Sequence, residues 1–351
     1  MYIRRNLTAP FVLRYTWTAL LWSTLWATTT LAAFFLFDIK WIDVPFELVS
    51  AVGIAVSFFI GFKNNQAYER FWEGRKIWGS IVNLSRTWTS QVLSLTAGED
   101  SHDPAALPMR QKALVYRHLA WINALRVQLR QPSGFGPQEN FMIERLVASH
   151  RDPATVQDVV TSFLAADERA TLDGKRNIAS QLILRQAEDI RVLRRDGAID
   201  GFGQMMLQQS LETCYDLQGM CERIKNTPFP RQYAFFSHVF TIIFCLLLPL
   251  GLLDVYEQEM LASFTFAQTF DTPYRQPTDI MLFAMVPLSV LVSWIFLTWE
   301  KIGDSSEDPF EGRPHDVSMS ALCRSIEIDL RDMLGEGNLP EKLPARDHIL
   351  Y

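Results

Sequence analysis

The sequence has little of what marks a compact secreted domain or an enzyme. Only 4 of its 351 residues are cysteine and no two form a CxxC pair, so a disulfide scaffold is excluded and a zinc or redox site has no support. The glycine-rich phosphate loop, the dinucleotide fingerprint, the serine-hydrolase elbow and the zincin motif are all absent. We therefore predict no enzyme activity.

Basic residues are in deficit. The chain has 33 lysines and arginines against 39 aspartates and glutamates, which gives a formal net charge of −6. A protein that binds nucleic acid needs a basic face to meet the phosphates. The charge balance therefore predicts no nucleic-acid partner.

Hydrophobic residues, 48% of the chain, are segregated into long runs. Three runs of 20 or 21 residues carry no Asp, Glu, Lys or Arg, and at about 1.5 Å per residue each can cross about 30 Å of hydrocarbon. A fourth run is shorter and carries Glu47 near its start, but its glycine, alanine and serine residues let helices pack closely in lipid. The four predicted spans are residues 18–37, 46–62, 233–253 and 280–299.

Charges on the connections predict the orientation of these spans. Arg4, Arg5 and Arg14 precede the first span, whereas the connection at residues 254–279 holds five acidic residues against a single Arg275. Because basic residues stay on the cytoplasmic side, we expect the N-terminus inside and the acidic connection outside. An even number of spans places the C-terminus in the cytoplasm as well.

Between the second and third spans the sequence predicts a helical cytosolic domain. No proline lies between Pro45 and Pro104, so the second span is expected to continue inward as one long helix. Its apolar residues recur at steps of three and four, which places one stripe on a helix: Ile77, Ile81, Leu84, Trp88, Val92 and Leu95. Further amphipathic stretches cover residues 108–129, 140–150, 154–164, 177–194 and 204–224.

The predicted fold is an all-α membrane protein with four transmembrane helices plus the helical cytosolic domain. Residues 1–62 hold the N-terminal segment and the first two spans, and residues 63–231 form the cytosolic domain. Residues 232–300 hold the last two spans, and residues 301–351 form an acidic turn, a helix and a tail. The tail from Gly335 is expected to be loose or wrapped on a neighbour.

The second span carries the candidate site. Ile54, Phe58 and Phe62 recur every four residues and so align on one helix face. If copies of this helix surround an axis, the three side chains form stacked apolar rings, and such rings gate ions by dewetting. The alternative, from the pattern alone, is a helix packed into the core of a bundle.

Longer runs around these residues resemble the bestrophins, in particular their bacterial members. The run GIAVSFFIGFKNNQAYERFW at residues 53–72 is similar to their second span. Later parts of the chain also resemble the family: CERIKNTPFP at 221–230 lies before the third span, and WIFLTWE at 294–300 with EDPF at 307–310 is similar to the fourth span and the acidic turn after it. The resemblance implies a homopentamer with one central pore in the inner (plasma) membrane. It also implies the lipid bilayer and small inorganic ions as partners, and no required cofactor.

The resemblance further implies roles for particular residues. Ile54, Phe58 and Phe62 match the three residues of the bestrophin pore neck. Phe202 matches a second constriction at the cytosolic aperture, and Met205 is the alternative on the same helix.

An acidic turn just after the fourth span has two interpretations. Animal bestrophins hold calcium in a denser acidic run at this place, and calcium prefers several carboxylate oxygens at short spacing. In this chain Asp304, Glu307 and Asp308 are interrupted by serine and proline residues. A capping and hinge role for Asp308 and Pro309 is therefore favoured over a calcium site.

Two features of the sequence favour opposite ion selectivities. The positive edges of two phenyl rings in the neck favour anions, whereas the acidic outer connection and Glu69, seven residues after Phe62, favour cations. We predict a channel for small monovalent anions such as chloride. A cation-selective channel and a membrane-anchored helical scaffold without transport activity are the alternatives.

Overall fold

The computed structural model describes residues 1–36, 44–96, 103–132, 155–269 and 279–351. Regular structure in these ranges is helical, and only isolated bridges pair Tyr2 and Arg346 with Ile349. The predicted all-α fold is confirmed. The predicted amphipathic stretch at residues 140–150 lies outside the described residues, as does Phe37 at the end of the first predicted span.

The chain forms two compact units. The membrane unit consists of residues Arg5–Glu69 and Phe229–Glu307. The amphipathic unit consists of residues Met1–Arg4, Arg70–Pro228 and Asp308–Tyr351. Helix α2 (Phe46–Leu95) is continuous over 50 residues, as the missing prolines predict, and contributes its two parts to the two units.

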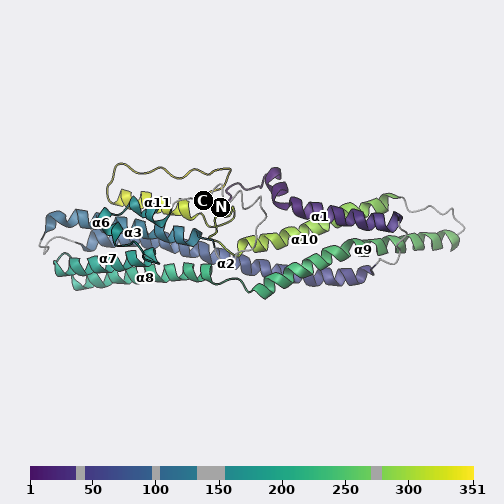
Figure 1. Ribbon diagram of the computed structural model, residues 1–351, viewed down its shortest axis with the longest axis horizontal. Helices are drawn as coiled ribbons and strands as arrows, with labels where there is room; N and C mark the ends of the chain where they lie inside the picture. Colours follow the sequence, from purple (N-terminus) through teal and green to yellow (C-terminus); the bar gives the residue numbers. More distant parts are fainter. Residues whose placement is uncertain (37–43, 97–102, 133–154, 270–278) are drawn as a thin grey trace. The chain divides into compact units, whose positions relative to one another are not determined.

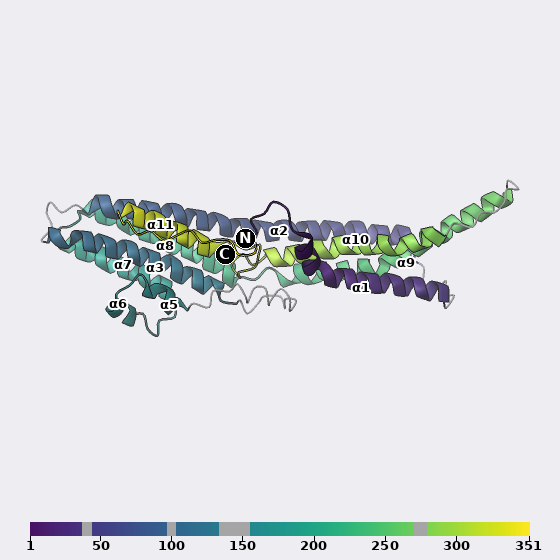
Figure 2. The ribbon, with the colours of Figure 1, turned by 90° about the horizontal axis from the view of Figure 1, so that it is seen from above.

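Within the described residues, the membrane unit is built from α1 (Ala9–Leu36), the first part of α2, α9 (Arg231–Thr269) and α10 (Asp279–Ser306). α1 lies along α10, and α10 lies along α9 (Figures 1 and 2). In the part of the chain that the structure describes, 3 helices are long and apolar enough to cross a membrane. They are α2, Arg231–Tyr256 of α9 and Ala284–Ser306 of α10.

Helix α1 covers the first predicted span but is not among those 3 helices. The threonine hydroxyls donate to carbonyls one turn earlier, for example Thr29 Oγ1 to the Leu25 carbonyl at 2.7 Å and Thr30 Oγ1 to the Trp26 carbonyl at 3.0 Å. These polar groups are satisfied inside the helix, which suits an apolar environment. A fourth membrane span stays a prediction.

Helix α9 is longer than the third predicted span. It continues to Thr269 instead of ending at residue 253, so the first part of the acidic connection is helical. No glycine or proline lies between Leu252 and Thr269 to end the helix earlier. The side chains of Glu257, Glu259 and Asp279 and all of Asp271 and Arg275 lie outside the described residues.

Helices α2 and α9 approach closely at two glycines. A Cβ atom on Gly53 would lie 2.7 Å from Cε2 of Phe244, and one on Gly251 would lie 2.9 Å from Cγ2 of Val49. Phe244 and Val49 are buried in one apolar cluster, so neither can move aside without disturbing its neighbours. Small residues in α2 therefore allow the close helix packing that the sequence predicts at Gly53.

We expect Gly53→Val to destabilise the membrane unit by about 1–3 kcal/mol, because the new side chain overpacks the contact with Phe244. Gly61 is the matched control on the same helix, since no atom lies within 4 Å of the position of its Cβ. Gly61→Val should change stability by less than about 0.5 kcal/mol. Thermal unfolding in detergent measures both variants, and equal losses would contradict the tight contact.

The amphipathic unit packs four long helices against the second part of α2: α3 (Leu107–Arg130), α7 (Ile178–Arg195), α8 (Gly201–Asn226) and α11 (Met319–Met333). Shorter elements in the described ranges are η3 (Pro104–Ala106), α5 (Val156–Thr161) and α6 (Ala166–Ala170). Fully buried Trp78, Trp88 and Trp121 are among the largest side chains of the core. The predicted apolar stripe is buried there from Ile77 to Val92, and its last member, Leu95, is partly buried against the same core, which confirms its helical periodicity.

The C-terminal tail is held by hydrogen bonds to its own chain, so the loose end is wrong, while wrapping on a neighbour stays a prediction. The Ile3 amide donates to the His348 carbonyl at 2.9 Å, and the Ala321 amide donates to the Tyr351 carbonyl at 2.7 Å. Nearer the end of α11, the Glu336 carboxylate accepts hydrogen bonds from three side chains of the same unit: Lys112 Nζ at 2.8 Å, Tyr116 Oη at 2.7 Å and Arg331 Nε at 2.7 Å.

Protonation of Glu336 should release this part of the tail. Burial raises the pKa of Glu336, but hydrogen bonds from Lys112, Tyr116 and Arg331 outweigh it and hold the pKa at about 2 instead of 4.5. Because the pKa is lowered on folding, the carboxylate stabilises the fold above about pH 4.5, and this contribution is lost as the pH falls toward about 2.

We therefore expect Glu336→Gln to weaken protection of the tail at pH 7 by about 2 kcal/mol, the scale of hydrogen bonds to a charged group. The difference from the unsubstituted protein should be smaller at about pH 3. Hydrogen exchange of the segment after Met333 measures both. A difference that stays the same at the two pH values would contradict the role of the ionised carboxylate.

Candidate functional site

The candidate site is an exposed apolar stripe on the membrane-unit part of α2. Its three members lie at successive turns of one helix face, and the exposed fractions of Ile54, Phe58 and Phe62 are 71%, 66% and 57%. The opposite side of the same helix is buried, as Val56 and Ile60 show. The stripe is therefore not part of the core of its own unit, and the bundle-core alternative is wrong for these side chains.

Two aromatic rings of the stripe are in contact. Phe58 and Phe62 meet edge to face, with ring centroids 4.5 Å apart and an interplanar angle of 90°. A phenyl ring is negative on its face and positive at its edge. Side chains of this kind repel water when they surround a narrow passage, while their edges remain able to meet an anion.

A partly buried ionic cluster begins at the residue next to the stripe. Lys63 is 4% exposed, and its Nζ lies 2.6 Å from Glu300 Oε1 and 2.5 Å from Asp304 Oδ1, both on α10. Ser237 of α9 donates a hydrogen bond to the other oxygen of Glu300 at 2.9 Å. We call Lys63, Glu300, Asp304 and Ser237 the clamp, because they tie α2 to both neighbouring helices.

The next residue makes the contact between α2 and α10 still closer. Asn64 Nδ2 donates to the Trp299 carbonyl at 3.1 Å. A Cβ atom on Gly303 would collide with Asn64 Oδ1, so a larger residue at this place on α10 would have to displace the Asn64 side chain. With Lys63 and Asn64 both held, the rotation of α2 about its axis is set, and so is the direction in which Phe62 points.

The clamp was not predicted from the sequence. Its signal was a charged residue at the end of two apolar runs, Lys63 after Phe62 and Glu300 after Trp299. Charges at such positions are costly unless they are paired. Because the two charges are opposite in sign and each needs a partner, they could have been predicted to form an ion pair between α2 and α10.

Each carboxylate of the predicted acidic turn has a basic partner. Asp304 lies in the last turn of α10 and pairs with Lys63, while Glu307 Oε1 lies 3.5 Å from Arg231. In the amphipathic unit, Asp308 Oδ1 lies 3.8 Å from Arg70. Among the described residues, no group of three or more His, Cys, Asp and Glu side chains is placed to hold a metal ion.

The two candidates for the aperture lie in the first turns of α8. Phe202 and Met205 are 74% and 61% exposed. Asp200 caps this helix end, since its side chain accepts a hydrogen bond from the Gly203 amide at 2.6 Å. The structure therefore presents both side chains outward from a well-formed helix start, and their role as a constriction stays a prediction.

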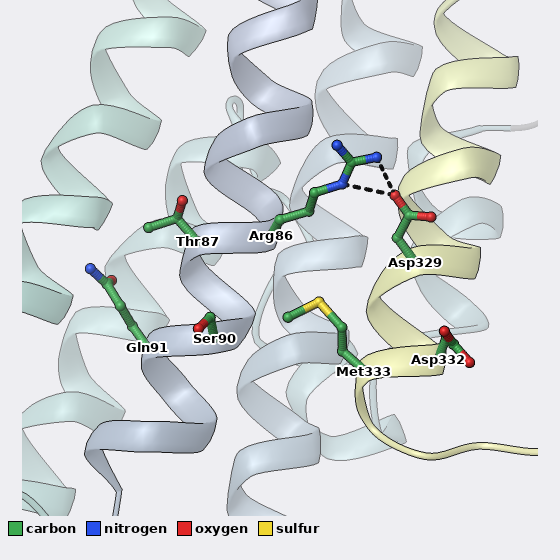
Figure 3. A pocket seen from close by; sticks show the side chains of 7 residues that line it. All are labelled: Arg86, Thr87, Ser90, Gln91, Asp329, Asp332 and Met333. Carbon is green, nitrogen blue, oxygen red and sulfur yellow. Dashed lines mark hydrogen bonds and ion pairs between the residues drawn. The ribbon is translucent and has the colours of Figure 1, made fainter.

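A shallow hollow in the amphipathic unit lies between α2 and α11 (Figure 3). Most of the residues that line it are of polar type, and Arg86 crosses it to pair with Asp329 at 2.6 Å (Figure 3). The other lining residues are Thr87, Ser90, Gln91, Asp332 and Met333. Because its arginine is already paired and its lining offers no convergent apolar wall, we assign no ligand to it.

Breaking the clamp should lower the free energy of unfolding. Lys63→Met should cost about 3–5 kcal/mol, because it leaves two carboxylates without their cation at a site where Glu300 is 2% exposed. Combining Lys63→Met with Glu300→Gln removes most of the unpaired buried charge and should recover part of the loss. Thermal unfolding of the detergent-solubilised protein measures both, and a single variant as stable as the parent would contradict the clamp.

The fold and these features define the class of the protein. It is an all-α chain with apolar helices long enough to cross a membrane, and Lys63 and Glu300, at the ends of two of them, are paired with each other. Residues 7–270 and 277–332 match the family described as Bacterial/Fungal Bestrophin protein. The chain belongs to the bacterial/fungal bestrophin family, as the resemblance predicts.

Relatives of known name are similar over most of their length. A protein of Mesorhizobium japonicum named voltage-dependent anion channel-forming protein is 30% identical over 320 residues, which are 90% of this chain and 82% of that protein. A protein of Escherichia coli K12 with the same descriptive name is 28% identical over 313 residues, 89% of this chain and 84% of that protein.

Solved structures show the same fold. The crystal structure of a bacterial bestrophin homologue from Klebsiella pneumoniae aligns with a TM-score of 0.71 at 21% identity and covers 92% of this chain and 99% of that one. A single-residue variant of the homologue from that organism aligns with a TM-score of 0.72, also at 21% identity. At this identity the likeness establishes the fold and no more.

Proposed function

We propose that this protein is an ion channel that passes small monovalent anions such as chloride. The observation that carries the proposal is the exposure of Ile54, Phe58 and Phe62 on one face of α2, beside a helix face that is buried. Relatives named voltage-dependent anion channel-forming proteins support the anion and the channel. The same names give no support for an enzyme.

The proposed assembly is a homopentamer in which five copies of α2 surround one pore. A large apolar stripe on a membrane helix can face lipid or identical neighbours, and the residues beyond Phe62 favour neighbours. Asn65, Gln66 and Glu69 continue on the exposed side of α2 directly after the apolar side chains. Polar and charged side chains that continue an exposed face directly beyond a span indicate that this face meets water or protein instead of lipid there.

In the proposed mechanism the three side chains form a hydrophobic neck. An ion cannot keep its full hydration shell in a narrow apolar tube, so a small change in diameter switches the passage between dry and conducting. The clamp holds α2 at Lys63, so that Phe62 keeps one orientation. Phe202 or Met205 would form a second constriction on the cytosolic side.

The proposed location is the bacterial inner membrane, with both termini in the cytoplasm. Arg4, Arg5 and Arg14 before the first span support this orientation. For the acidic turn we propose a structural role, since the contacts of Asp304 and Glu307 with Lys63 and Arg231 use carboxylates that calcium would need. No cofactor is required by this proposal.

A cation-selective channel is the second candidate. It is favoured by Glu69, which is exposed on α2 and carries a negative charge at the inner end of the neck. Purified protein in planar bilayers decides between the two candidates. With asymmetric KCl, the sign of the reversal potential identifies the ion that carries the current, and we expect the sign for chloride.

We expect replacement of Ile54, Phe58 and Phe62 by alanine to raise the open probability, because smaller side chains widen the neck and let water remain in it. The control is Leu288→Ala on α10, an apolar residue that is 50% exposed and lies outside the stripe. This control should leave gating unchanged. Unchanged gating in the neck variant, or equal effects in both, would contradict the neck.

A further inference from the structure

Glu69 continues the line of the neck on α2. It follows Phe62 by seven residues, which is two helical turns, so the two side chains lie on the same side of the helix. Glu69 is exposed, like Phe62, and it belongs to the same unit. At about 1.5 Å per residue, its backbone lies about 10 Å beyond that of Phe62 along the helix axis.

Unlike Lys63 and Glu73 on the same helix, Glu69 has no ion pair within the described residues. Lys63, earlier on α2, is neutralised by two carboxylates in the clamp. Glu73, one turn later, pairs with Arg223 at 2.6 Å. The contact found for Glu69 within the described residues is a hydrogen bond from the neutral Asn65 amide, Nδ2 to Oε1 at 3.1 Å, and no ion pair accompanies it.

An uncompensated carboxylate at this distance acts on ions that enter the neck. The screening length is about 8 Å at physiological salt, close to the separation between Glu69 and Phe62 along the helix. Several identical carboxylates around one axis add their potentials, and a mouth with low-dielectric walls strengthens the field. The local concentration of anions falls there, and that of cations rises.

Resting on the proposed pore, we infer that Glu69 is a specificity-determining residue that lowers the entry of anions from the cytoplasmic side of the neck. Anions that arrive from the outer side reach the apolar neck before they meet this charge. The anion current therefore rectifies, and the movement of chloride out of the cytoplasm is the weaker direction. Asn65 positions the carboxylate by its hydrogen bond.

Excised inside-out patches in symmetric KCl test this inference, because the two sides of the membrane are known. Glu69→Gln should raise the current of chloride leaving the cytoplasmic side by about twofold or more and make the current–voltage relation more symmetric. Glu69→Lys should reverse the rectification. Glu69→Asp keeps the charge and is the matched control, which should rectify like the parent. In about 1 M KCl the difference between Gln and Glu should shrink, since screening is stronger.

Failure of this inference and failure of the proposed function give different results. Anion current whose rectification is the same in the parent and in Glu69→Gln overturns the role of Glu69 and leaves the channel intact. A cation-selective parent whose selectivity falls in Glu69→Gln overturns the proposed anion and supports Glu69 as the charge that selects. A parent protein that carries no current overturns both.

Discussion

The pairing of Lys63 with Glu300 and Asp304 is the interaction on which the candidate site depends. Each of these charges lies at the end of an apolar run, where an unpaired charge would be expensive, and together they join α2 to α10. Ser237 adds α9 to the same cluster. Because Lys63 follows Phe62 directly, the polar contact fixes the orientation of the apolar side chains beside it. Removing one partner destabilises the protein because it leaves a buried charge unpaired, whereas the intact cluster contributes mainly the geometry of the helices that it joins.

The two sides of α2 in the membrane unit obey different constraints. The side that faces α9 needs small residues, since Gly53 lies against the ring of Phe244. The other side carries Ile54, Phe58 and Phe62, which have no role in the packing of their own unit. Under the proposed function that side meets other copies and water. The apolar neck would then control whether ions pass, while the charge of Glu69 would control which direction is favoured.

Sequence patterns predicted the features that depend on local periodicity. The stripe of Ile54, Phe58 and Phe62 and the long α2 follow from helical spacing and missing prolines, and both are present in the structure. The clamp was missed because Lys63 and Glu300 are 237 positions apart and only the fold brings them together. The length of α9 was underestimated because hydropathy reports where lipid ends, whereas the helix continues until a residue stops it. The neighbours of an exposed face cannot be read from one chain, so the assembly and the selectivity stay proposals.

The central claim is that the exposed stripe of α2 faces a water-filled passage instead of lipid. Cysteine substitution at Phe62, followed by a charged, water-soluble thiol reagent during current recording, tests it most directly. The comparison is cysteine at Leu288 on α10, which is also exposed but lies outside the stripe. The account predicts that the reagent changes the current through the Phe62→Cys channel and leaves the Leu288→Cys channel unaffected. A Phe62→Cys channel that does not respond, or an equal response at both positions, would contradict it.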